Sequence, residues 1–179
     1  MTYHLLTWPD PILSRRCEPV RVDQLGKLVP AIDAMLWTVD EHKALGIAAN
    51  QVGCPLRVIV ARIAGKLEVM INPVIKERWG ARRAPESCLS VPGLSIEVTR
   101  SETIVVTHAC KDCRFQIDGV PPPPPHEHPR LTLSGLEAAI VQHEIDHLDG
   151  KTLADLPAAR RGTNREVLDK LRAQHARAK

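Results

Sequence analysis

The stretch SGLEAAIVQHEIDHLDG, residues 134–150, predicts the helix around which the rest of the chain folds. Ser134 and Glu137 have the Ser-x-x-Glu spacing of a capping box, and Gly150 stands where such a helix would end. Between these two signals, one side of the helix collects Leu136, Ala139, Ile140, His143 and His147. We therefore expect a helix whose largely apolar face is covered by other elements.

The two histidines of this helix have the spacing of metal ligands. His143 and His147 lie four residues apart, so they project from the same face about one turn apart and can reach one ion. Glu144 points to a neighbouring face, from which it can reach a water on that ion without being a ligand. The alternative is a pair of core histidines, but burying two imidazoles and a carboxylate is costly unless each finds a partner. The pattern favours a metal site.

Two histidines do not complete a catalytic site, which usually takes three protein ligands and leaves a position for water. Cys88 lies in the turn-rich segment PESCLSVPG, but by spacing alone Cys54, Cys110 and Cys113 compete with it. A distant acid is a further candidate. A zincin-like metallopeptidase, with a downstream acid as third ligand and a structural Cys88, is therefore a second hypothesis.

The remaining patterns predict the fold class. Apolar residues at helical spacing indicate a helix over 25–43, with Pro30 expected in the first turn of its main part. Short β-branched runs predict strands over 57–61, 67–72, 94–98, 103–108 and 113–118. Thr163 and Glu166 open a final helix. We expect one α+β domain over residues 1–179, with small antiparallel sheets around the central metal-binding helix.

Composition excludes several classes of protein. The 179 residues carry a net charge of +3, which does not indicate a sequence-specific nucleic-acid protein. No segment approaches the roughly 18 apolar residues of a membrane span, and no presequence pattern precedes PDPIL at 9–13. Five cysteines without a secreted framework suggest a reducing compartment, so a cytoplasmic protein is expected. The five prolines at 121–125 predict an exposed loop, and Cys110 and Cys113 are interpreted as ordinary thiols at a hairpin turn.

Three segments together resemble one family. Residues 142–150, QHEIDHLDG, resemble the QHExDHLxG signature of peptide deformylases. Residues 86–90, ESCLS, resemble the EGCLS motif of that family, and residues 44–51, ALGIAANQ, resemble its GxGxAAxQ motif. The three occur in the family's order and at similar spacing, and PDPILSRRCEPV at 9–20 and INP at 71–73 also match. The resemblance covers nearly the whole chain.

The resemblance implies an activity and a site. The activity is hydrolysis of the N-formyl group from the formyl-methionine that begins bacterial nascent chains. Cys88, His143 and His147 would hold one divalent metal, with Fe²⁺ favoured and Zn²⁺, Ni²⁺ or Co²⁺ able to substitute. Glu144 would carry the proton, and the Gln51 side chain and the Leu89 N–H would stabilise the oxyanion.

The resemblance also assigns substrate contacts and a partner. Gly46 and Arg100 would contact the peptide, and Leu45, Leu136 and Ala139 would line a methionine pocket. Arg100 has a plain alternative as a solvated strand-edge residue. In the family, a basic C-terminal helix can dock on the ribosome. Residues 160–179 here carry seven basic against two acidic residues, a net charge of +5, although a solvated helix face explains such a run equally simply.

The match has two departures. Ala44 stands where the first motif has glycine, and Ser87 stands where the second has glycine. Either change could narrow the substrate groove, because glycine permits close backbone approach. Together with the proline insertion, they leave open a deformylase-like protein that binds peptides or the ribosome without turnover.

Overall fold

The computed structural model describes residues 3–109 and 130–177. The helices in these ranges are α1 (Leu25–Glu41), α2 (Gly135–Leu148) and α3 (Gly162–Arg177), with short 3-10 turns beside them. The strands are β1 (Gly46–Ala48), β2 (Val58–Ile63), β3 (Lys66–Ile71), β4 (Val74–Trp79), β5 (Arg82–Cys88), β6 (Val91–Arg100), β7 (Thr103–Thr107) and β8 (Arg130–Ser134). None of the described helices is long and apolar enough to cross a membrane. The expected strand at 113–118, the proline tract at 121–125 and the Cys110 and Cys113 pair lie outside the described residues.

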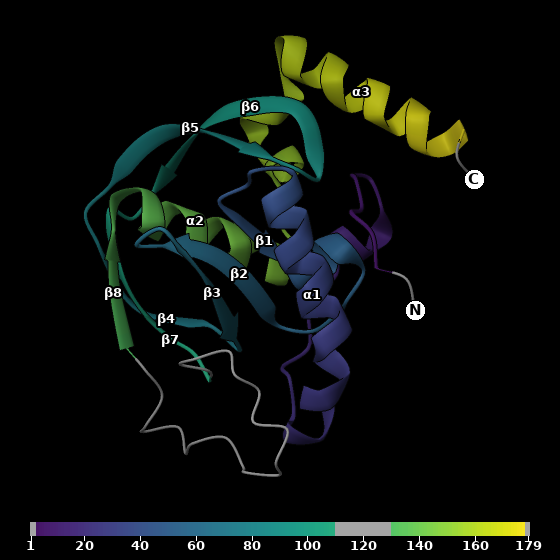
Figure 1. Cartoon of the computed structure of the whole chain (residues 1–179). Helices are drawn as coiled ribbons and strands as arrows, with labels where there is room; N and C mark the ends of the chain where they lie inside the picture. The colour runs from purple at the N-terminus through teal and green to yellow at the C-terminus, as the bar shows by residue number, and fades with distance from the viewer. Residues whose placement is uncertain (1–2, 110–129, 178–179) are drawn as a thin grey trace.

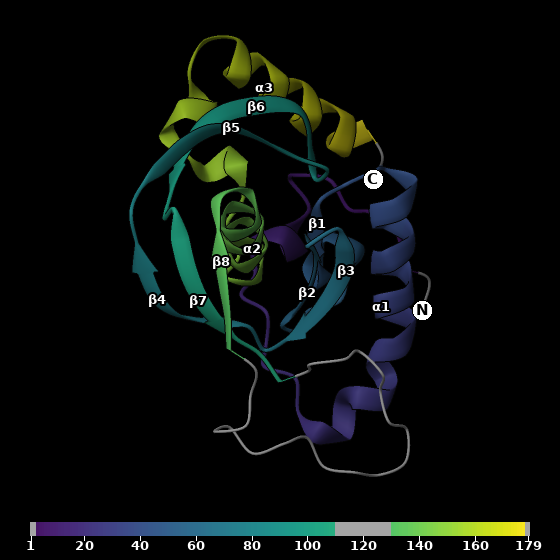
Figure 2. The ribbon, with the colours of Figure 1, turned by 60° about the vertical axis from the view of Figure 1, so that its left-hand side comes forward.

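The described strands form antiparallel sheets that surround α2. Their orders are β1-β2-β3, β4-β7-β8 and β5-β6. Figure 1 shows α2 in the middle of these sheets, and Figure 2 shows α2 between β7 and β8 on one side and β1 to β3 on the other, with α1 outside. The expected α+β class, with small antiparallel sheets around the central helix, is confirmed.

The sheet β1-β2-β3 separates two apolar layers because its residues alternate between faces. Val58 and Val60 of β2 belong to the cluster formed with α1, which includes Met35 and Val39. Ile59 and Ala61 belong instead to the cluster formed with α2. This period of two lets one short sheet cover both helices.

The helix α2 is buried along most of its length. Ala138, Val141 and Leu148 of α2 pack with Ile104 of β7 and Leu133 of β8 in the same cluster. Because strands cover α2 on two sides, its buried polar residues either bond to neighbouring segments, as Gln142 does to the Ser101 backbone, or face an opening between the sheets. This arrangement fixes the site described below.

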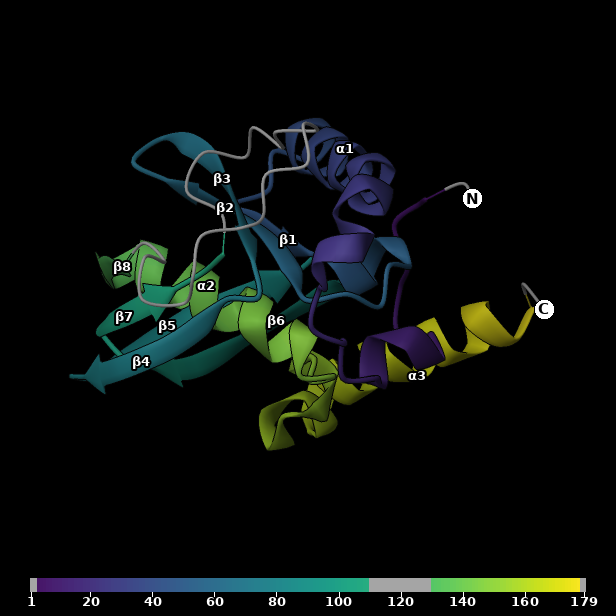
Figure 3. The ribbon, with the colours of Figure 1, turned by 90° about the horizontal axis from the view of Figure 1, so that it is seen from below.

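A third cluster joins the N-terminal segment, β6 and α3. Figure 3 shows α3 running beneath β6 and past the N-terminal segment. The Trp8 N–H donates to the Ser90 carbonyl at 2.8 Å, and the Arg172 guanidinium lies 4.8 Å from the centre of the Trp8 ring. These contacts brace the turn that follows Cys88.

Two local predictions were wrong in detail. The capping box at Ser134 does not form, because Ser134 Oγ pairs with Thr103 Oγ1 at 3.0 Å and Glu137 Oε1 accepts from the Ala64 N–H at 2.8 Å. The chain instead enters α2 through Gly135, whose φ is +60°. Pro30 lies inside α1 rather than in its first turn. The carbonyl that Pro30 leaves without a donor belongs to the exposed Gly26, where water can bind it.

Candidate metal centre

The central helix and the end of β5 bring three potential metal ligands together. His143 and His147 project from α2 with ring centroids 5.0 Å apart. Cys88 ends β5 at a register shift opposite β6, and its Sγ lies 3.1 Å from Nε2 of His147. Ligand atoms of all three residues lie within 4.8 Å of one another. Among the described residues, this is the group of His, Cys, Asp and Glu side chains with metal-binding geometry.

The chemistry of this group fits a bound divalent ion. Sulfur and nitrogen ligands of tetrahedral zinc lie about 2.3 and 2.0–2.1 Å from the ion, which separates two ligand atoms by about 3.5 Å. The 3.1 Å between Cys88 Sγ and His147 Nε2 is close to that value, and all three ligand atoms lie within 4.8 Å of one another. Cys88 and His147 are also buried, and buried ionisable groups require a partner. The three residues therefore suit one ion with a position left for water.

The resolved alternatives for the third ligand lie elsewhere. Cys54 packs in the cluster between α1 and the β1-β2-β3 sheet, and Cys17 packs in the cluster around α2. Neither belongs to the metal group. Cys88 and not Cys54 is therefore placed to be the third ligand, which spacing along the sequence could not decide. Cys110 and Cys113 fall outside the described residues.

A chain of ion pairs orients His143. Its Nδ1 donates to Glu86 Oε2 at 2.9 Å, which leaves Nε2 to face Cys88 and His147. Glu86 in turn accepts from Nε and Nη2 of Arg100 at 2.8 and 2.9 Å. Arg100 also pairs with Asp146, one turn along α2. The ring of His143 is thereby held by residues from β5, β6 and α2.

These contacts shift the pKa values. Burial opposes the charge on Glu86, but hydrogen bonds from Arg100 and His143 outweigh it and lower the pKa of Glu86 to about 2. Burial opposes the charge on His143 as well, and its contacts with Cys88 and Glu86 still raise its pKa. Burial lowers the pKa of His147.

Glu144 lies on the neighbouring face of α2, as the helical spacing predicts. Its side chain is 4% exposed, and its Oε2 has no hydrogen-bond partner among the described residues. Burial raises the pKa of Glu144 to about 7. A carboxyl group with a pKa near neutrality can both take and return a proton.

Gln51 is fixed by three contacts. Its Oε1 accepts from the Ala48 N–H at 2.7 Å, and its Nε2 donates to Ser90 Oγ at 3.1 Å and lies 3.6 Å from Cys88 Sγ. The amide N–H groups are therefore held beside the metal group. Leu89 follows Cys88 directly in the turn between β5 and β6.

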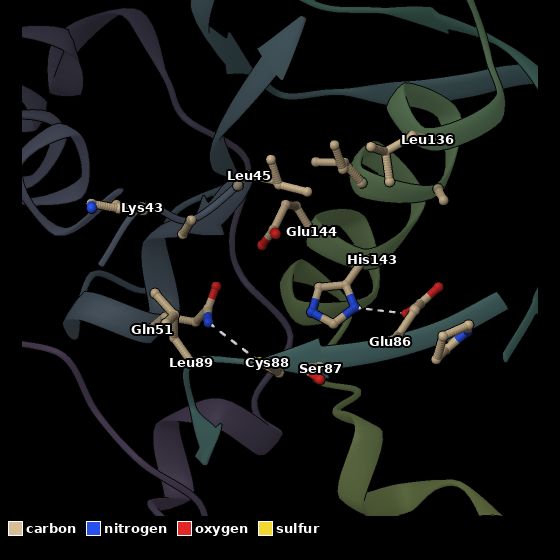
Figure 4. Close-up of a pocket in the computed structure, with 15 residues that line it drawn as sticks. Lys43, Leu45, Gln51, Glu86, Ser87, Cys88, Leu89, Leu136, His143 and Glu144 are labelled. Atoms are coloured by element: carbon tan, nitrogen blue, oxygen red, sulfur yellow. Dashed lines mark hydrogen bonds and ion pairs between the residues drawn. The ribbon is translucent and has the colours of Figure 1, made fainter. Parts of the chain in front are cut away.

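A hollow of about 350 Å³ opens onto the metal group. Figure 4 shows the residues that line it, with His143, Glu144 and Gln51 directed towards its interior. Of the residues proposed from sequence, the lining includes Leu45, Gly46, Gln51, Cys88, Leu89, Leu136, Ala139, His143 and Glu144. The sheets and α2 therefore bring almost the whole predicted site to one place.

Some residues of the lining were not assigned a role from sequence, and two predicted residues, His147 and Arg100, lie outside the lining. Lys43, Pro85 and Ile140 line the hollow without having been singled out, and Glu86 was quoted only as part of a motif. Glu86 precedes Cys88 by two residues on a strand, so the two side chains are expected on the same face. This spacing could have identified Glu86 from the sequence. Arg100 lies behind His143, with its guanidinium engaged by two carboxylates. Its contact with substrate stays a prediction.

Comparisons with known proteins agree with this geometry. The family model described as "Polypeptide deformylase" matches residues 2–117 and 125–161. A peptide deformylase from Alkalilimnicola ehrlichii is 39% identical over 174 residues, covering 93% of this chain and 89% of that protein. One from Aquifex aeolicus is 37% identical over 163 residues, covering 87% of each. A crystal structure of a peptide deformylase from Legionella pneumophila superposes with a TM-score of 0.78 at 32% identity and covers 99% of both chains.

Proposed function

Because this chain belongs to the polypeptide deformylase family and is a metal-dependent deformylase, we propose that Glu144, Gln51 and Leu89 carry its reaction on formylated nascent peptides. The observation that supports these roles is the common hollow, in which all three residues flank the Cys88–His143–His147 group. We assign proton transfer to Glu144 and stabilisation of the oxyanion to Gln51 and Leu89.

Glu144 is proposed as the proton carrier. Cys88, His143 and His147 would hold the ion, whose contribution when bound would be to make water more acidic and to polarise a carbonyl group. Glu144 takes a proton from the attacking water and later delivers it to the leaving amine. Its raised pKa, buried position and unpartnered Oε2 support both transfers.

Gln51 and Leu89 are proposed to stabilise the oxyanion. The developing negative charge on the formyl oxygen requires donors that are already in place. Gln51 Nε2 is held by Ser90 and lies beside Cys88, and the Leu89 N–H follows the same cysteine. Pre-positioned donors of this kind contribute about 10²–10³ in turnover each.

The substrate is proposed to lie along β1. Among the strands of residues 3–109 and 130–177, β1 pairs only with β2, so its other edge is proposed to accept an extended peptide. Leu45 and Leu136 are 44% and 54% exposed although both are large apolar side chains, and with Ala139 they suit the first methionine side chain. Gly46 allows the peptide and Glu144 to approach the strand closely.

We further propose Fe²⁺ as the cellular metal, with Zn²⁺ or Ni²⁺ able to replace it. One thiolate and two imidazoles are ligands that all three ions accept, so availability decides among them. Metal analysis of protein purified without oxygen, combined with formate release from a formyl-methionyl peptide, tests this choice. Iron at one ion per chain with activity supports it, and zinc alone in the most active preparation contradicts it.

The third ligand separates the deformylase from a zincin-like metallopeptidase. Cys88→Ala is expected to remove the bound metal and all formate release, because a two-histidine remnant binds weakly. Cys54→Ala, a buried thiol outside the group, is the matched control and should retain the metal. Metal retained after Cys88→Ala would favour the metallopeptidase.

A cytoplasmic location and a ribosome contact complete the proposal. Arg160, Arg165 and Arg172 line a second hollow beside α3, within the segment of net charge +5. Clustered arginines facing phosphates bind with a strong dependence on salt. The double variant Arg160→Glu/Arg165→Glu changes two exposed side chains and keeps the buried face of α3, so it is expected to abolish salt-sensitive co-sedimentation with ribosomes while small peptides are still deformylated. Co-sedimentation that survives these changes, or that is absent from the unchanged protein at low salt, rules the contact out.

A further inference from the structure

Lys43 is a charged residue of the lining that has no role in the proposed reaction. It follows the C-terminus of α1 and lines the same hollow as Glu144 and Cys88. Its side chain is exposed, and its φ of +50° lies in the left-handed region that lysine rarely adopts. Figure 4 shows Lys43 and Leu136 at opposite sides of the pocket, with Leu45 and Glu144 between them.

None of the described residues neutralises the charge of Lys43. No ion pair involves Lys43 within residues 3–109 and 130–177. The nearby Asp40 pairs with Arg62 at 3.6 Å. The carboxylate of Glu86, also in the lining, is taken by Arg100 and His143. Lys43 therefore contributes to the lining a flexible cationic side chain that has no ion-pair partner among the described residues.

The position of Lys43 relates it to the residues that follow the substrate's methionine. Position 46 touches Glu144, and Lys43 lies three residues before it along the same segment. Three residues span at most about 10 Å, which is also the reach of two to three residues of an extended peptide. A peptide whose formyl group lies at Glu144 and which runs from the start of β1 at Gly46 back towards position 43 passes Lys43 with its second or third residue.

We propose that Lys43 determines specificity by attracting an acidic side chain at the second or third residue of the formylated peptide. The inference rests on the proposed binding of substrate along β1. An exposed pair in water contributes little, so the expected preference is about two- to fivefold in kcat/KM. The ratio of the two kcat/KM values should fall towards one in about 1 M salt, where the screening length is about 3 Å.

The test uses formyl-Met tripeptides that carry Asp or Asn at the second or the third position. These two side chains have the same shape and differ in charge. The wild-type protein should prefer Asp over Asn at one of the two positions. Lys43→Asn should remove the preference, and Lys43→Asp should reverse it. Both replacements tolerate a positive φ, so the backbone at position 43 is preserved.

A matched control separates local from overall charge. Lys76 is exposed on β4 and does not line the hollow, so Lys76→Glu changes net charge as Lys43→Asp does and should leave the preference intact. An equal Asp-to-Asn ratio in the wild-type protein and Lys43→Asp, or an equal change in Lys76→Glu, would overturn the inference. Absence of formate release from every peptide would instead refute the proposed function.

Discussion

A Cβ atom at position 46 would lie 2.7 Å from Oε1 of Glu144 and 2.9 Å from Cγ2 of Ile140. The backbone of β1 therefore packs directly on the carboxyl group proposed to carry the proton. We expect Gly46→Ala to displace Glu144 and to lower kcat at least tenfold, with a destabilisation of about 1–3 kcal/mol from overpacking. Formate release and urea unfolding measure the two effects. Gly26→Ala, at a site with open space, is the control. Normal kcat in Gly46→Ala would contradict the packing argument.

The buried carboxyl group of Glu144 gives a second prediction. Glu144→Gln keeps the shape of the side chain but removes the proton carrier, so turnover should fall by about 10²–10⁴. Metal content should stay at the wild-type level, because Glu144 is not in the group of Cys88, His143 and His147. Elemental analysis and formate release on the same sample test this. Near-normal turnover in the variant would show that another group moves the proton.

Arg100 tests whether the ion pairs behind His143 support the metal. Arg100→Met removes the partner of both Glu86 and Asp146, and residues that orient metal ligands typically contribute about 10–100-fold in affinity. We expect weaker metal binding in a competition with a chelator. Arg83→Met, which breaks an exposed pair with Glu97 on the same hairpin, should change little. Unchanged metal affinity with a raised KM would assign Arg100 to the substrate instead.

Cys17 predicts a dependence of stability on pH. Burial raises the pKa of Cys17 from 9.0 to about 12. The neutral thiol is therefore favoured by folding: its contribution is complete below about pH 9 and is lost as the pH rises towards 12. Between these values, the thiol should lower the free energy of unfolding by up to about 1.4 kcal/mol per pH unit. Cys17→Ala should show a correspondingly shallower decline in urea unfolding above pH 9. If the free energy of unfolding fell equally with pH in the wild-type protein and in Cys17→Ala, the decline could not be assigned to the Cys17 thiol.

Several elements escaped sequence analysis for identifiable reasons. The strand β4 is mostly exposed, and β5 contains Pro85, so neither shows an alternating apolar pattern. Pro85 is tolerated because β5 pairs with β6 alone and has a free edge. The capping box at Ser134 failed because Ser134 pairs with Thr103 of β7 and Glu137 accepts from Ala64 in the turn between β2 and β3. Here contacts made through the fold outweighed the local preference.

The sequence by itself determined the central helix, the pairing of His143 with His147 and the neighbouring place of Glu144. These follow from the 3.6-residue period of a helix, which any segment of suitable composition obeys. Spacing along the sequence left Cys88 and Cys54 both open, and the motif at 86–90 only implied Cys88; the tertiary structure decided that Cys88 lies beside the two histidines and that Lys43 lines the same hollow. Cys88 and His147 are 59 residues apart along the chain. Cys88 and His147 come together because β5 passes across α2, and the packing of all the sheets determines where β5 lies.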